Sequence, residues 1–70
     1  SRNLFEEVMK LPDKYRIVIH LFYYEDYSVR EIDKILKLSE SNVKVRISRG
    51  RALLKDSLKE DWENDYSRKI

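Results

Sequence analysis

Basic side chains gather in one stretch of the chain, residues 39–55, where their types and spacing could bind an anionic partner. They are Lys44, Arg46, Arg49, Arg51 and Lys55. The stretch contains one acid, Glu40, so its net charge is +4, whereas the whole chain carries only +2. Lysine and arginine neutralise backbone phosphates, and arginine can also form two hydrogen bonds with the edge of a guanine. The stretch therefore predicts a surface that contacts nucleic acid.

Other kinds of chemistry find little support in the composition. The chain has no cysteine and a single histidine, His20, which is too few for a typical zinc site. Glu6 and Glu7 are adjacent in sequence and do not face each other across a cleft, and no nucleophile is paired with a base. We expect no enzymatic activity, no metal, no cofactor and no small-molecule substrate. His20 is expected to be a partly buried structural residue.

The basic residues are predicted to lie on a helix. Val43, Ile47, Gly50 and Leu54 recur at intervals of four, three and four, which places them on one inward face. At 3.6 residues per turn, the opposite face carries small or basic residues. These are Ser41, Lys44, Val45, Ser48, Arg49, Ala52 and Lys55. A small, positive face suits a DNA groove, and Ser39 is placed to cap the start of this helix.

A second apolar stripe precedes this helix and predicts a helical hairpin. Val29, Ile32, Ile35 and Leu36 have helical spacing, and Leu38 closes the turn that follows. Ser28 with Glu31 three residues later is the pattern of a capping box. Residues 28–55 therefore predict a helix-turn-helix.

Two more helices are expected before the hairpin, and a helical extension after it. Apolar spacing predicts a short helix over residues 3–10, and Pro12 is expected to begin a second, central core helix. The stripe of the first helix is Leu4, Phe5, Val8, Met9 and Leu11; that of the second is Tyr15, Val18, Ile19 and Phe22, widened by Ile17, Leu21 and Tyr24. Beyond Leu54 the stripe continues through Leu58, Trp62 and Tyr66 and predicts an extension over about 56–66. We expect Trp62 to pack back on the first two helices. The alternative is that Leu58, Trp62 and Tyr66 form a partner-binding or dimerising surface.

The overall composition predicts one small all-α domain of four helices. The chain has 70 residues, of which 40% are charged, with one glycine and one proline. No apolar run approaches the roughly 20 residues that a membrane span needs, and no signal sequence is visible. We therefore expect no membrane insertion and a cytoplasmic location. Since the chain begins at Ser1 without methionine, we expect it to be a piece of a longer protein.

Three sequence blocks resemble a known family. They are LPDKYRIVI followed by YYED, then YSVREIDKIL, then SESNVKVRISRGRALLK. In this order and at these spacings, over residues 11–58, they resemble the C-terminal region-four domain of bacterial RNA polymerase sigma factors, most closely the extracytoplasmic-function group. The resemblance implies a last helix that enters the major groove of the −35 promoter element. It also implies docking on the flap of the polymerase β subunit and, in many members, on an anti-sigma factor.

The resemblance assigns roles to individual residues of this chain. Base-reading positions fall on Ser41, Lys44, Val45, Ser48 and Arg49, with Glu40 near the groove. Arg49 could contact guanine, Ser48 several bases, and Val45 a thymine methyl group. Phosphate contacts are expected from Arg30, Ser39, Asn42 and Arg46, for which Lys44 is also well placed. The aromatic and acidic surface formed by Phe22, Tyr23, Glu25, Asp26 and Tyr27 is expected to contact polymerase or an anti-sigma factor.

Three positions depart from the family pattern. Asp33 stands where the family usually has an alanine packed against the second hairpin helix, and it is expected either to tip outward or to accept a bond from a basic neighbour. Lys37 stands where the family has the turn glycine, so the turn is expected to be strained or to differ in geometry. Gly50 replaces the usual alanine, at an expected cost of about 1 kcal/mol in helix propensity.

Two alternative functions remain open. A response-regulator output domain also contains a helix-turn-helix but normally works as a dimer on paired half-sites. A sigma-like module could instead act mainly through polymerase or anti-sigma contacts. The stoichiometry of protein on a single-site duplex separates the first alternative from a sigma domain, and binding to protein without DNA binding identifies the second.

Overall fold

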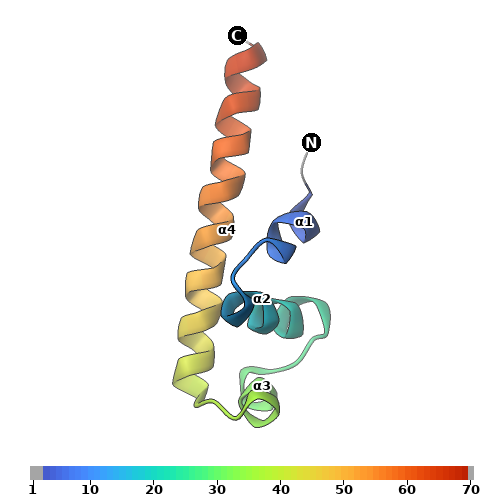
Figure 1. Ribbon diagram of the computed structural model, residues 1–70, viewed down its shortest axis with the longest axis vertical. Coiled ribbons are helices and arrows are strands. Elements are labelled where there is room, and N and C mark those ends of the chain that lie inside the picture. Colours follow the sequence, from blue (N-terminus) through green and yellow to red (C-terminus); the bar gives the residue numbers. More distant parts are fainter. Residues whose placement is uncertain (1–2, 70) are drawn as a thin grey trace.

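The chain folds into a small all-α domain built along one long helix (Figure 1). The computed structural model describes the backbone of residues 3–69 and the side chains of residues 3–58. Its elements are α1 (Leu4–Met9), α2 (Asp13–Ile19), the π-helical turn η1 (His20–Tyr24), α3 (Val29–Leu36) and α4 (Glu40–Lys69). The predicted fold class is confirmed, with four α-helices and no strand in the described residues. The predicted packing of Trp62, and the place of Tyr66 on the same stripe, concern side chains outside the described residues.

The shorter helices pack along the first half of α4 and enclose a single core. The molecule measures 49 × 18 × 17 Å, and α4 continues beyond its neighbours toward the C-terminus (Figure 1). Every helix contributes to the core, directly or through the residues that flank it. The buried apolar side chains are Val8, Leu11, Val18, Ile19, Ile32, Val43, Ile47 and Leu54. The predicted inward face of the basic helix and the central position of the second helix are thus confirmed.

The caps predicted for the hairpin are formed. The Ser28 hydroxyl accepts a hydrogen bond from the Glu31 amide at 3.1 Å, and the Glu31 carboxylate accepts one from the Ser28 amide at 2.9 Å. These bonds to Ser28, backbone first, lower the pKa of Glu31 below its usual value. The stabilisation by the charged carboxylate is therefore present above the ordinary glutamate pKa and is lost as the pH falls through the lowered one. At the start of α4, Ser39 accepts a hydrogen bond from the Asn42 amide at 3.0 Å.

The turn between α3 and α4 keeps a left-handed residue although no glycine is present. Lys37 has φ 57° and ψ 44°, and its amide donates to the Asp33 carbonyl, as does the Leu38 amide at 3.3 Å. The Lys37 bond is that of the αL motif and the Leu38 bond that of the Schellman motif, and both motifs normally have glycine at the left-handed position. Of the two expected outcomes, the strained turn is therefore the observed one.

Replacing Lys37 with glycine is expected to raise the free energy of unfolding by about 1 kcal/mol, because glycine adopts the left-handed conformation without the steric cost of a Cβ atom. Lys37→Ala is the matched control: it removes the same charged side chain but keeps Cβ, and should leave stability close to that of the parent. Urea unfolding followed by far-ultraviolet circular dichroism measures both. Equal stabilisation by alanine and glycine would mean that the lysine charge, and not the backbone, is unfavourable.

Several predicted apolar stripes are wider than the buried faces. Ile35 is 49% exposed, so its assignment to the inward stripe of α3 was wrong. Leu4, Phe5, Met9 and Ile17 are also exposed. The reason is geometric: α1 and α3 are short and pack on one side only, so residues at the margin of each stripe have no neighbouring element to cover them.

The other two departures from the family pattern lie within the helices of the hairpin. Asp33 is half-buried, and within residues 3–58 its carboxylate forms no hydrogen bond or ion pair, so the expected bond from a basic neighbour is not observed. Its carboxylate oxygens are not buried, which agrees with the expected outward direction. Gly50 is buried where α2 crosses α4, and a Cβ atom there would lie 2.9 Å from Cγ1 of Ile19. The estimate of about 1 kcal/mol considers helix propensity alone. It does not include the close contact between α2 and α4, which an alanine at this position would disturb.

The second helix is followed by a π-helical turn, and no sequence pattern predicted this turn. His20 is half-buried, as expected, and its ring stacks on Tyr24 with the centroids 5.4 Å apart. Its Nε2 lies 3.3 Å from a Glu25 oxygen, which forms an ion pair when the histidine is protonated. Asp26 follows with φ 58°, the second left-handed residue without glycine. The turn directs Glu25, Asp26 and Tyr27 outward together.

Candidate nucleic-acid interface

The first turns of α4 present the predicted base-reading residues to solvent as one face. Ser41, Lys44, Val45, Ser48 and Arg49 are all exposed. They lie opposite the buried Val43 and Ile47, which hold the helix against α2 and α3. The packing of two apolar positions thus determines which side chains an approaching duplex meets.

Val45 is informative because it is apolar and 42% exposed on this otherwise polar face. Nothing in the described part of the chain covers it. A methyl-bearing side chain in that position can contact the methyl group of thymine in the major groove. Arg49 lies one turn further on the same side, and among residues 3–58 no acid pairs with it. Its guanidinium is therefore available to a base edge.

The predicted phosphate contacts differ in how available they are. Ser39 already accepts the cap bond from Asn42 and lies 3.2 Å from the Ser41 hydroxyl, so its main role is local. Asn42 is exposed and Arg46 half-buried, one turn apart on one flank of α4. Arg30 is exposed in the first turn of α3, on the other helix of the hairpin. The structure thus brings Asn42 and Arg46 together and leaves Arg30 separate.

The opposite flank of α4 borders a hollow to which sequence reasoning assigned no role. It has a volume of about 260 Å³. Its lining is Phe22, Val29, Lys44, Ile47, Ser48 and Arg51. Arg51 was recognised only as part of the basic stretch. The available signal was its separation from Lys44, seven residues, which returns to the same side of a helix after about two turns.

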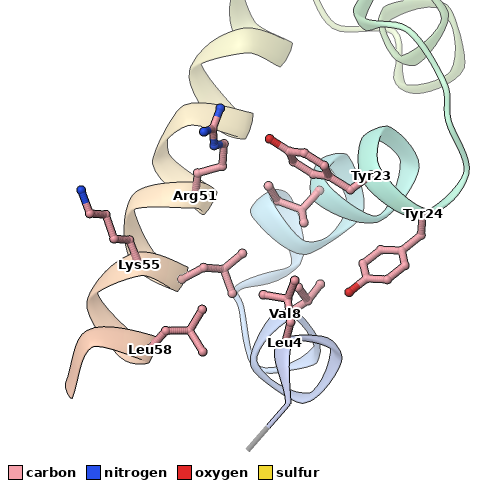
Figure 2. Close-up of a pocket in the computed structure, with 9 residues that line it drawn as sticks. Leu4, Val8, Tyr23, Tyr24, Arg51, Lys55 and Leu58 are labelled. Carbon is pink, nitrogen blue, oxygen red and sulfur yellow. The ribbon is translucent and has the colours of Figure 1, made fainter. Parts of the chain in front are cut away.

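A larger open groove lies between α1, η1 and α4, and Figure 2 shows its lining. It has a volume of about 770 Å³ and an apolar floor, with Arg51 and Lys55 on the α4 side. The remaining lining residues are Leu4, Val8, Ile19, Tyr23, Tyr24, Leu54 and Leu58. An exposed apolar groove of this kind is typical of a surface that contacts another protein.

The five residues predicted to contact polymerase or an anti-sigma factor do not form one patch. Tyr23 lines the large groove, whereas Phe22 is half-buried beside the smaller hollow, with the two rings 4.9 Å apart. Glu25, Asp26 and Tyr27 are exposed in the loop after η1. The structure therefore places Tyr23 at the large groove, Phe22 at the smaller hollow, and Glu25, Asp26 and Tyr27 in the loop after η1.

Glu7 is a buried acid that no sequence pattern distinguishes from its neighbours. It is 4% exposed and accepts a hydrogen bond from the Ser57 hydroxyl of α4, and Lys10 Nζ lies 3.6 Å from its second oxygen. The bond to Ser57 joins α1 to α4, whereas Lys10 lies at the end of α1 itself. Because its neighbour Glu6 is exposed, only the fold distinguishes the two acids.

Within the described residues, no group of three or more histidine, cysteine, aspartate or glutamate side chains could hold a metal ion. In that same part of the chain, no helix is long and apolar enough to cross a membrane.

Comparison with known proteins gives a consistent result. Residues 1–54 match the family described as "Sigma-70, region 4". The chain is 43% identical over 60 residues to the ECF RNA polymerase sigma factor SigW of Bacillus subtilis (strain 168), which covers 86% of the chain and 32% of that protein. It is 36% identical over 61 residues to the RNA polymerase sigma factor FliA of Pseudomonas aeruginosa, covering 87% of the chain and 24% of that protein.

The chain thus spans about a third or less of the length of these relatives. Both relatives are sigma factors, and the match covers the hairpin and the helices before it. These similarities favour the sigma-factor interpretation of the helix-turn-helix over the response-regulator alternative.

Proposed function

Because the chain belongs to the sigma-70 region 4 family, we propose that it binds DNA through the exposed face of α4 and reads the −35 element of a promoter. In the longer protein it would serve a sigma factor that directs RNA polymerase to promoters, acting in the cytoplasm, by binding and without catalysis. One observation carries the proposal: the side of α4 opposite the core is exposed and made of small and basic residues. That composition lets the helix approach base edges while it neutralises phosphates.

The experiment is selection from a pool of randomised short duplexes at low salt, with sequencing of the bound fraction. A short enriched motif is expected. With about four to six phosphate contacts, log affinity should fall against log salt with a slope of about −4 to −5. Salt-sensitive binding without enrichment would instead mean that this domain supplies no sequence specificity of its own. A single protomer on each duplex, measured by sedimentation, would also exclude the dimeric alternative.

A second contact is proposed with the polymerase core, through the groove between α1, η1 and α4. An apolar segment of the β flap is the occupant that the family resemblance implies, and the exposed Tyr23 and Leu4 give it an apolar surface. An anti-sigma factor could use the same surface. In this interpretation the acidic loop at Glu25 and Asp26 lies beside the groove and adds charge at its margin.

Replacing Tyr23 with aspartate is expected to reduce binding to purified core polymerase by about tenfold or more, since it places a charge against an apolar partner surface. Because Tyr23 is 47% exposed, the fold should tolerate the change. Ile35→Asp is the matched control, because Ile35 is as exposed but lies on α3, away from the groove. Pull-down with core polymerase measures both, and an equal loss in the two variants would contradict the assignment.

A further inference from the structure

We propose that the hollow between α4 and the η1–α3 segment seats one backbone phosphate of the bound DNA, held by Lys44 and Arg51 together. The inference rests on the proposed DNA binding and refines it. It divides the residues of α4 into base readers on the open face and phosphate holders on one flank. Arg51, which the sequence interpretation counted only as part of the basic stretch, becomes a phosphate-binding residue.

The lining of the hollow supports an anionic occupant. Of its six lining residues, two are cations, one carries a hydroxyl group, and none is acidic. Both cations and Ser48 are exposed, and no ion pair within residues 3–58 occupies Lys44 or Arg51. Phe22, Val29 and Ile47 form an apolar floor that holds the charged groups at the rim. A phosphate oxygen can therefore meet two cations and a hydroxyl donor at once.

The direction of Arg51 brings its guanidinium toward the start of α4. Helical side chains lean toward the N-terminus of their helix, so Arg51 reaches back over the turn that carries Ser48. Figure 2 shows Arg51 extending this way, toward the preceding turns of α4. Lys44 lies about two turns earlier on the same flank, so one phosphate can lie between the two cations.

The same geometry separates Lys44 and Ser48 from the other predicted base readers. Val45 and Arg49 follow Lys44 and Ser48 by one residue each, about 100° around the helix, and they do not line the hollow. A duplex that places base edges against Val45 and Arg49 would place the backbone of one strand against Lys44, Ser48 and Arg51. Sequence preference is then carried by the first pair, and register on the duplex by the second group.

The test uses the 70-residue chain with a duplex enriched from the random pool and a scrambled duplex, followed by fluorescence anisotropy. Arg51→Ala is expected to weaken binding to both duplexes alike, by about tenfold at low salt, as loss of a charge-assisted phosphate contact would. Arg51→Lys should retain most of the affinity. Lys14→Ala is the matched control, an exposed cation on α2 that lines neither the hollow nor the large groove, and it should change affinity much less.

Two further measurements make the assignment specific. If both cations hold one phosphate, the Lys44→Ala, Arg51→Ala double variant should have a salt slope shallower by about 0.9, whereas two separate phosphates would change it by about 1.8. In the second measurement, a neutral methylphosphonate replaces one DNA phosphate at a time. At one backbone position, Lys44→Ala and Arg51→Ala should then cause no further loss of affinity.

The outcomes separate this inference from the proposed function. If Arg51→Ala weakened binding to the enriched duplex but not to the scrambled one, Arg51 would be a base reader, and the proposed phosphate site would be wrong. Equal effects of Arg51→Ala and Lys14→Ala would reduce the proposed phosphate contact to general electrostatic attraction. An absence of sequence enrichment with the Arg51 effects intact would instead overturn promoter reading and leave the phosphate seat standing. If the unmodified chain bound no duplex at all, both would be wrong.

Discussion

Arg49→Ala is expected to lower the preference for an enriched duplex over a scrambled one by about tenfold to a hundredfold, the range for losing a bidentate contact with guanine. Arg49 lies on the exposed face of α4 one turn beyond Val45, and its guanidinium has no acidic partner within residues 3–58. An arginine free of intramolecular pairs does not have to break one in order to bind a base. The measurement is the ratio of the two dissociation constants at one fixed salt concentration.

Two substitutions control for charge. Arg49→Lys retains the positive charge but loses the planar fork, so it should keep the salt slope and lose most of the preference. Arg46→Ala removes a cation from the flank of α4 and should weaken both duplexes equally. If Arg49→Ala weakened the enriched and scrambled duplexes by the same factor, Arg49 would be a phosphate contact, and base reading would have to be assigned to other residues of the face.

The hairpin could be predicted from sequence because its signals are local. Capping by Ser28 with Glu31 and by Ser39 depends on residues within one turn, and the buried positions Val43 and Ile47 follow from helical period alone. The exposed face of α4 consists of the residues on the side opposite these buried positions, so its residues could be listed before any tertiary contact was known. The candidate interface therefore follows from the same argument as the helix that carries it.

What sequence did not reveal depends on neighbours distant in the chain. Ile35 fits the stripe of α3, but only the fold determines that no element covers it. Glu7 and Glu6 are indistinguishable until α4 brings Ser57 to one of them. Arg51 acquired a candidate role only when η1 and α3 supplied the other walls of a hollow. Helical periodicity gives the direction of a side chain and carries no information on what lies opposite it.

Gly50→Ala is expected to lower the free energy of unfolding by about 1 to 2 kcal/mol, although alanine is the better helix former by about 1 kcal/mol. The added Cβ atom would lie 2.9 Å from Cγ1 and 3.2 Å from Cδ1 of Ile19, and 3.4 Å from Cβ of Tyr15. Ile19 is 1% exposed and cannot move into solvent, so α2 and α4 must separate or Ile19 must leave its rotamer. Ala52→Gly, at an exposed position of the same helix, measures the propensity term alone and should cost about 1 kcal/mol.

A double-mutant cycle with Ile19→Ala separates steric conflict from other effects of Gly50→Ala. Ile19→Ala removes both atoms that the new Cβ would approach most closely. By itself it should lower the free energy of unfolding by about 2 to 5 kcal/mol. The cycle is therefore measured with the osmolyte trimethylamine oxide, which keeps each variant folded. In that background Gly50→Ala should become neutral or stabilising, which gives a coupling energy of about 1 to 3 kcal/mol. Additive effects would show that Gly50 is not retained for the approach of α2. Its contribution to positioning α4, and with it the DNA-facing surface, would then need another explanation.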